Sequence, residues 1–187
     1  MTNETPSNRS RETVLQAAFT TLAADPGASL AEIAAAAGVG RATLHRHFAG
    51  RDDLMRAMAL RALEELDAAV EEATRDAPSY SEALRLSLDA MIPLAARHWF
   101  LANDDLSSDP EIAAAYEKDA AEMRATVEGA RDEGTFAADV PTHWIVATFD
   151  ALLFAAWEQV RDAELTPKQA SALAWRTLTT GLKGPPA

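Results

Sequence analysis

Two short helical patterns joined by a glycine turn constrain this chain more than any other stretch of its sequence. The first covers residues 30–36 and the second covers residues 41–48. Ser29 followed by Glu32 three residues later is the pattern of a capping box, in which the two side chains satisfy free backbone N–H groups at a helix start. Gly38 stands where a helix is expected to end in the left-handed conformation, which glycine adopts without a Cβ penalty. The stretch therefore predicts a helix-turn-helix.

The second helix of this unit has a thin apolar stripe and a broad polar face. Leu44 and Phe48 are four residues apart, so they share one side of the helix. The rest of its surface carries Arg41, Ala42, Thr43, His45, Arg46 and His47. Because the second helix of a helix-turn-helix lies in the major groove, we expect double-stranded DNA to be the partner of this face. The alternative is a helix face that contacts only solvent.

The distribution of charge along the chain favours the DNA interpretation. The formal net charge is −12, which by itself argues against a partner whose phosphates attract Lys and Arg. Between Gly38 and Arg51, however, the sequence has three arginines, two histidines and no Asp or Glu, whereas from Arg56 onward 23 acidic residues face 12 basic ones. A small basic face on an acidic body can bind DNA while the body limits non-specific association. The alternative is an acidic protein with an incidental basic turn.

The remaining patterns are helical, so the predicted fold class is all-α. Apolar residues at helical spacing predict helices from Arg9 to about Ala24, from Arg51 to about Arg75 and from Ser79 to about Leu101. The last of these contains Pro93, which predicts a kink. Such a kink could open a cavity or could be tolerated without one.

Three further helices are predicted after residue 108. Asp109-Pro110 and Thr166-Pro167 each place a capping residue before a proline, and Pro141 begins the helix between them. The predicted organisation is a flexible arm at residues 1–8, a helix-turn-helix domain at 9–53, a helical bundle at 54–183 for ligand binding and dimerisation, and a tail at 184–187.

The sequence lacks the residues that several classes of function require. The chain has no cysteine, which excludes disulfides and thiolate metal sites. His45 and His47 are two residues apart on a helix and cannot share a metal ion. We find no glycine-rich phosphate loop and no nucleophile elbow, so we expect no metal, no cofactor and no enzymatic activity. The first residues lack the apolar core of a signal peptide, and no apolar run approaches the ~20 residues of a membrane span. A cytoplasmic protein is expected.

Residues 9–54 resemble the DNA-binding domain of the TetR family of transcriptional regulators. The resemblance rests on Leu15, Ala18 and Phe19, on Ile33-Ala34 before Ala37-Gly38-Val39, on Thr43-Leu44 and His47-Phe48, and on Arg51-Asp52-Asp53-Leu54. The sequence departs from the family at two positions, with His45 where the family usually has Tyr and Arg51 where it usually has Lys. The resemblance implies a ligand-responsive, DNA-binding repressor.

Each residue of the proposed DNA face has a predicted role. Arg41, Ala42 and Thr43 at the helix start are expected to reach base edges. His45, Arg46, His47 and Arg51 are expected to hold phosphates, which set the register of binding but not its sequence preference.

The short recognition helix implies a dimer, because one such helix reads few base pairs. A two-fold dimer predicts a palindromic operator. The last two helices are consecutive and apolar, which makes them the predicted interface, and the family also dimerises there. The alternative is that both helices bury these faces inside their own monomer.

The middle helices are expected to enclose a small apolar or aromatic ligand that releases the repressor from DNA. The predicted ligand contacts are Met91, His98, Trp99, Asn103, Met123, Trp144, Phe149, Asp150 and Trp157. Asp150 interrupts an apolar helix, and a buried carboxylate needs a partner either in the ligand or across the dimer. The alternative function is a ligand-binding or scaffolding helical bundle without DNA binding.

Overall fold

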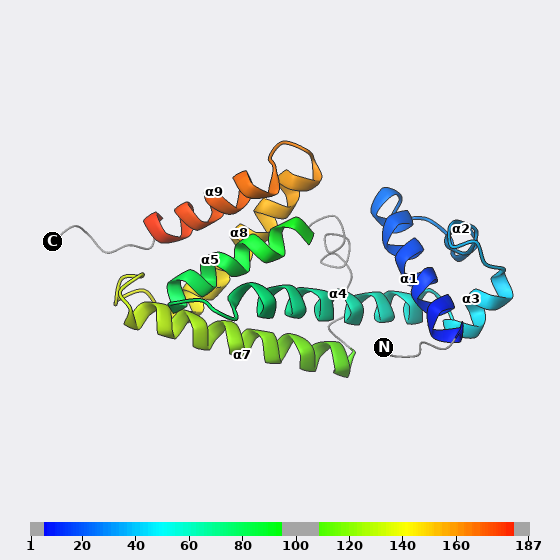
Figure 1. Ribbon diagram of the computed structural model, residues 1–187, viewed down its shortest axis with the longest axis horizontal. Helices are drawn as coiled ribbons and strands as arrows, with labels where there is room; N and C mark the ends of the chain where they lie inside the picture. Colours follow the sequence, from blue (N-terminus) through cyan, green and yellow to red (C-terminus); the bar gives the residue numbers. More distant parts are fainter. Residues whose placement is uncertain (1–5, 95–108, 182–187) are drawn as a thin grey trace.

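The computed structural model describes residues 6–94 and 109–181, and within these ranges it is helical without strands. Figure 1 shows the order of the helices along the chain. Their bounds are α1 Pro6–Ala24, α2 Leu30–Ala36, α3 Arg41–His47, α4 Arg51–Thr74, α5 Tyr80–Met91, the 3₁₀ turn η1 Ile92–Leu94, α7 Pro110–Asp132, α8 Thr142–Arg161 and α9 Pro167–Gly181. The predicted all-α class is confirmed. Among these helices none is long and apolar enough to cross a membrane.

Helix α4 connects the two ends of the molecule. Helices α1, α2 and α3 gather at one end, and α4 runs from them into a body formed with α5, α7, α8 and α9 (Figure 1). At 1.5 Å per residue its 24 residues span about 36 Å. Helix α3, the predicted recognition helix, therefore lies at one end of an elongated molecule, and α4 is the element that carries it.

Two clusters of buried side chains form the core. The first joins α1, α2 and α3 to the first half of α4, from Leu54 to Leu63, and also includes Ile112 of α7. The second joins α5, α7, α8 and α9 around residues such as Phe149 and Trp157. Ile112 is fully buried, so the first turn of α7 packs into the same cluster as the helix-turn-helix.

Ser79 followed by Glu82 repeats the capping-box pattern of Ser29 and Glu32, but the two positions have different outcomes. At α2 the box is complete, because Glu32 donates its N–H to Ser29 Oγ at 3.3 Å and accepts the Ser29 N–H at 2.7 Å. At α5 only half of it forms, since Ser79 accepts the N–H of Glu82 but the Glu82 carboxylate turns to Arg85.

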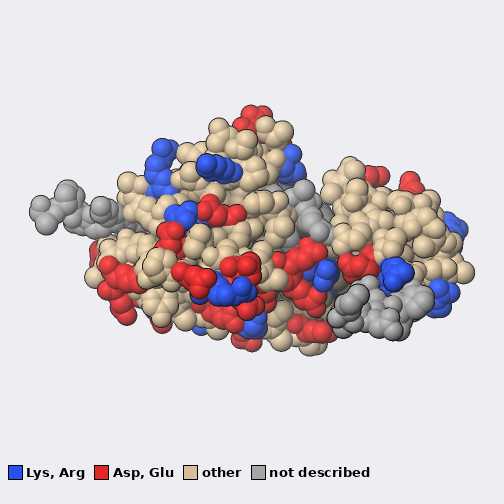
Figure 2. Space-filling model, viewed as in Figure 1, with Lys and Arg blue, Asp and Glu red and all other residues tan. Residues whose placement is uncertain are grey.

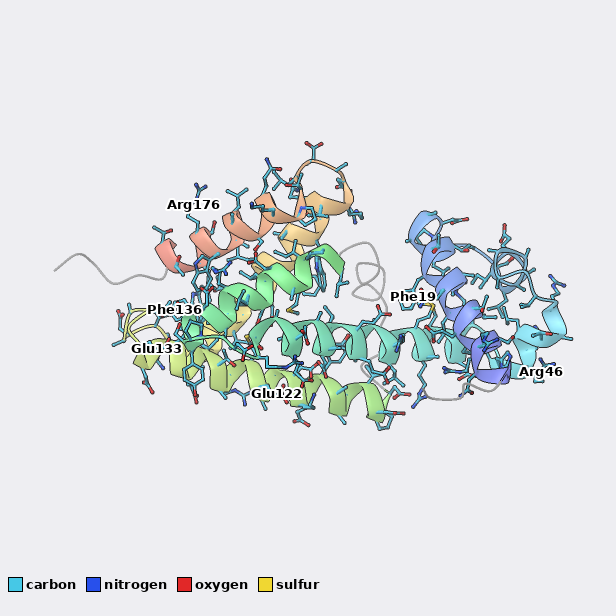
Figure 3. All side chains as sticks on the ribbon, viewed as in Figure 1. Phe19, Arg46, Glu122, Glu133, Phe136 and Arg176 are labelled. Carbon is cyan, nitrogen blue, oxygen red and sulfur yellow. The ribbon has the colours of Figure 1, made fainter. Side chains whose placement is uncertain are left out.

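Glu133, the C-cap residue of α7, adds a second cap to the start of α5. Its carboxylate accepts the backbone N–H groups of Tyr80 and Ser81 at 3.0 and 2.9 Å, and Figure 3 shows it beside the first turn of α5. A residue from another helix thus satisfies two backbone donors in the first turn of α5 that the predicted capping box does not reach.

Several helix bounds differ from those expected, among them the start of α8, which lies at Thr142 with Pro141 as its N-cap. Helix α1 begins at Pro6, before the predicted start at Arg9. Helix α5 does not continue as a kinked helix through Pro93, because it ends at Met91 and η1 follows. Proline has no N–H to donate and its ring crowds the preceding turn, so the chain changes to a tighter 3₁₀ turn here. The rest of the predicted helix, to Leu101, lies outside the described residues.

Candidate nucleic-acid interface

The turn between α2 and α3 has the geometry that its glycines predict. Gly38 has a φ of +68°, the left-handed conformation expected of it. The N–H of Gly38 reaches the carbonyl of Ala35 at 3.0 Å, and that of Val39 reaches Ala34 at 2.9 Å. Gly40 is the N-cap of α3 in an extended conformation and provides no side-chain cap. The turn therefore closes through backbone bonds alone.

Helix α3 buries one stripe and exposes the rest. Leu44 and Phe48 are each 1 % exposed, and the guanidinium of Arg11 lies 5.2 Å from the centre of the Phe48 ring. The exposed face of α3 consists of Arg41, Ala42, His45 and Arg46, with Thr43 half-buried beside them. Figure 3 places Arg46 at the outer end of the molecule, away from the helical body.

A shallow hollow of about 390 Å³ lies between α3 and the start of α2. It is lined by Ser29, Leu30, Ala31, Arg41, Leu44 and His45. Two of the predicted DNA contacts, Arg41 and His45, therefore border one concave surface.

The two histidines of α3 have different surroundings. His45 is exposed, whereas His47 is half-buried and its Nε2 lies 3.2 Å from Ser10 Oγ of α1. His47 thus links the recognition helix to α1. Sequence patterns did not indicate Ser10 and Arg11, which support α3 from α1, because residues 37 positions apart in the chain leave no local signal.

Arg51 contacts the protein's own backbone. Its two terminal nitrogens donate to the carbonyl oxygens of Pro26 and Ala28, each at 2.7 Å. These bonds occupy part of the guanidinium that was predicted to hold a phosphate, although a guanidinium has five N–H groups and the residue stays exposed.

The acidic residues lie mainly away from this end of the molecule. Figure 2 shows Asp and Glu gathered over the body formed by α4 and α7. Lys118 of α7 lies 2.9 Å from Asp67 of α4, and 3.8 and 3.7 Å from Asp119 and Glu122. Desolvation, with repulsion from Asp67 as the next cause, raises the pKa of Asp119 to about 6.

Four of the predicted ligand contacts meet in the second core cluster. Phe149 and Trp157 are buried, and Met91 and Met123 are half-buried against the same cluster. The indole N–H of Trp157 donates to the Met91 carbonyl at 3.0 Å, which joins α8 to the end of α5. Three other predicted contacts, His98, Trp99 and Asn103, lie outside the described residues.

The last two predicted ligand contacts, Trp144 and Asp150, are not buried in this cluster. Trp144 is 57 % exposed and Asp150 is also exposed, although partial desolvation raises the pKa of Asp150. In the single chain the structure therefore does not bring Trp144 and Asp150 together with Met91, Phe149 and Trp157.

An exposed apolar stripe follows the outward face of α8. It contains Trp144, Ala147, Ala151 and Phe154, and Leu173 is exposed on neighbouring α9. Phe149 and Trp157, which belong to the same helix, are buried within the monomer. The spacing of three and four residues from Trp144 to Phe154 is a second helical stripe, and it is visible in the sequence.

Comparisons with known proteins agree with this geometry. Residues 15–58 match the family model for bacterial regulatory proteins of the tetR family. The chain is 35 % identical over 155 residues to the HTH-type transcriptional repressor LfrR of Mycolicibacterium smegmatis, and the match covers 82 % of this chain and 80 % of that protein.

Solved structures give the same result. The crystal structure of LfrR from Mycobacterium smegmatis in complex with proflavine matches with a TM-score of 0.79 and 31 % identity, over 95 % of this chain and 98 % of that one. The ketosteroid transcriptional regulator KstR2 of Mycobacterium tuberculosis matches with a TM-score of 0.75 over 99 % of this chain and 98 % of that one. Its 18 % identity shows a shared fold alone.

Proposed function

This chain belongs to the TetR family of bacterial regulatory proteins, and we propose that it is a transcriptional repressor that leaves its operator when a small molecule binds. The single observation that carries the proposal is the exposed face of α3, which presents Arg41, His45 and Arg46 without any acidic residue. That face lies at the far end of an otherwise acidic molecule (Figure 2). We assign DNA binding to residues 9–53 and ligand binding with dimerisation to residues 54–183.

The proposed DNA contacts divide into two kinds. Arg41, Ala42 and Thr43 begin α3 and would meet base edges, where losing a bidentate contact costs about 1–3 kcal/mol of discrimination. His45 and Arg46 would meet phosphates, so their loss would weaken binding to all sequences alike.

A second copy of the chain is the proposed occupant of the exposed stripe on α8. Large apolar side chains such as Trp144 and Phe154 exposed along one helix mark an interaction surface more often than a solvated one, and the family dimerises through its last two helices. Two-fold symmetry would place two α3 helices on a palindrome with half-sites about 34–36 Å apart, or a multiple of that.

The interface proposal is tested by Phe154→Asp, which places a charge within the stripe. Sedimentation velocity should show a dimer for the unchanged protein and a monomer for the variant. Tyr116→Asp is the matched control, because Tyr116 is an equally exposed aromatic residue on α7, away from the stripe. A wild-type protein that sediments as a monomer at micromolar concentration would refute the interface.

The proposed ligand is a planar aromatic molecule that binds near the second core cluster. The support is the aromatic and thioether character of Phe149, Trp157, Met91 and Met123, together with the relative LfrR, whose structure was solved with proflavine. A coupling free energy of about 1–3 kcal/mol between ligand and DNA would change operator affinity 5–150-fold.

The function is tested by fluorescence anisotropy with DNA from upstream of the protein's own gene. We expect tight, salt-dependent binding, relaxed preference at one base pair in Arg41→Ala, and release of DNA on titration with proflavine. Absence of DNA binding by the wild-type protein even at low salt would contradict the proposal and favour a ligand-binding or scaffolding bundle. DNA binding that proflavine does not change would exclude proflavine as the molecule that releases the operator and leave the DNA-binding function standing.

A further inference from the structure

One side chain joins the two ends of the helix-turn-helix. Arg51 is the first residue of α4, immediately after the unit, and its guanidinium donates to the carbonyls of Pro26 and Ala28, immediately before the unit. The donor and the acceptors are 25 and 23 residues apart in the chain. Helices α2 and α3 and their turn lie between them, so the guanidinium closes a loop around the whole DNA-binding motif.

The motif needs such support because its helices are short. Each of α2 and α3 has seven residues, and isolated helices below about 12–15 residues are marginal in water. Their relative position therefore depends on whatever holds the segments at both ends and on a few buried side chains, namely Ile33, Ala34, Leu44 and Phe48.

The bonds made by Arg51 suit arginine specifically. A guanidinium is a rigid planar fork that can donate to two acceptors at a fixed separation, whereas the ammonium of lysine is a single point charge on a flexible stem. Here the two terminal nitrogens reach two different carbonyls at the same distance of 2.7 Å. Arg46, by contrast, is exposed on α3 at the outer end of the molecule (Figure 3).

We propose that Arg51 is a positioning residue of the DNA interface, which holds the segment before α2 against the start of α4 and thereby sets where α2 and α3 stand. The inference rests on the proposed DNA-binding function and deepens it. It differs from the phosphate-holding role expected from the sequence, because the fork would act through the protein backbone and would change the fit to the operator more than the total attraction to phosphates.

Asp25 offers an independent probe of the same segment. Its carboxylate accepts the N–H of Gly27 at 2.9 Å, and its carbonyl accepts the N–H of Ala28 at 3.0 Å. Asp25→Ala would loosen the turn that presents the two carbonyls to Arg51. Since this variant removes a negative charge, electrostatics alone would strengthen DNA binding, whereas the positioning role predicts weaker binding to the operator.

The experiment measures operator and non-specific DNA affinity of the full chain over a series of salt concentrations, at a temperature where thermal unfolding shows every variant folded. Arg51→Lys, which keeps the charge but loses the fork, should bind the operator about tenfold more weakly, the effect of losing about one charge-assisted hydrogen bond. Its non-specific affinity and salt slope should stay unchanged. Asp25→Ala should show the same pattern, and the double variant should lose less than the two single losses combined. Arg46→Ala is the phosphate control, and both its affinities and its salt slope should fall.

Three results would overturn the inference while leaving the proposed function standing. Arg51→Lys with wild-type operator affinity, beside Arg51→Ala with a reduced salt slope, would make Arg51 a phosphate contact. Variants that lower the melting temperature but leave operator affinity unchanged would make the fork merely structural. Stronger operator binding by Asp25→Ala would mean that the turn at residues 25–28 does not position the DNA-binding helices. A wild-type protein that binds no DNA would overturn the proposed function itself, and this inference with it.

Discussion

The carboxylate of Asp109 lies 2.6 Å from the guanidinium Nε of Arg56, and this contact joins the N-cap of α7 to the first half of α4. The same carboxylate caps α7, because it accepts the N–H groups of Glu111 and Ile112. Arg56 also pairs with the Glu111 carboxylate. The start of α7 is therefore tied by charge to the helix that carries the helix-turn-helix, at the point where Ile112 enters its core.

The Arg56–Asp109 pair should make stability depend on acid. The hydrogen bond from Arg56 lowers the pKa of the Asp109 carboxyl, so the folded state favours the ionised form. Its contribution to the free energy of unfolding is present above the ordinary carboxyl pKa and is lost as the pH falls through the lowered value. Asp109→Asn should unfold at a lower temperature than wild type at pH 7, and the difference should narrow below about pH 4. Calorimetry over this range checks it. A difference that does not change with pH would mean that the charge pair with Arg56 is not its cause, since asparagine caps a helix about as well as aspartate.

Asp119 should show the opposite dependence. Its pKa is raised to about 6, so the folded state binds more protons than the unfolded state between the ordinary carboxyl pKa and about 6. The free energy of unfolding should therefore fall as the pH rises through this interval. Asp119→Asn should be more stable than wild type at pH 7, by about 1 kcal/mol after solvent screening, and nearly equal at pH 4. Urea titrations at both pH values measure this. A variant less stable than wild type at pH 7 would be inconsistent with the raised pKa.

The two glycines that flank Val39 should respond in opposite ways to substitution. Gly38→Ala should destabilise the fold by about 1 kcal/mol, because an L-residue is strained at a φ of +68° even though no neighbouring atom lies within 4 Å. Gly40→Ser should stabilise it by a few tenths of a kcal/mol by adding a side-chain cap to α3. Chemical denaturation of both variants is the measurement. Equal effects would mean that backbone conformation does not distinguish these two positions.

Gly129 should be intolerant of a methyl group because Tyr80 covers it. A Cβ on Gly129 would lie 2.4 Å from the Tyr80 ring, and the Tyr80 backbone is held in place by Glu133. We expect Gly129→Ala to cost about 1–3 kcal/mol through overpacking. In a Tyr80→Ala background the same substitution should cost little, and a double-mutant cycle by thermal unfolding measures the difference. If Gly129→Ala remains equally destabilising in the Tyr80→Ala background, the added methyl group disturbs α7 itself and not its contact with Tyr80.

Local patterns in the sequence predicted the helices well. The capping box at Ser29, the left-handed turn at Gly38 and the proline start of α7 each depend on residues within four positions of one another. Such interactions exist as soon as the helix forms, so the order of residues is enough to reveal them. The all-α fold, the helix-turn-helix and the resemblance to the TetR family accordingly follow from the residue order alone.

The sequence did not predict which face of α8 is buried in the core. Trp144 and Phe149 are both aromatic residues of one apolar helix, but they are five positions apart, which turns them about 140° from each other around the axis. A helix that is apolar on more than one side does not reveal which side meets its own core. The structure buries Phe149 and leaves Trp144 exposed.

The sequence by itself determined that two short helices and a glycine turn would present an acid-free face, since that outcome depends on helical spacing and turn conformation alone. Only the tertiary structure decided that Arg51 turns back to Pro26 and Ala28, and that Glu133 caps a helix 53 residues away. A charged side chain bonds to whichever acceptor or donor packing brings within reach. For these residues that group belongs to a distant segment, so no local pattern in the sequence could specify it.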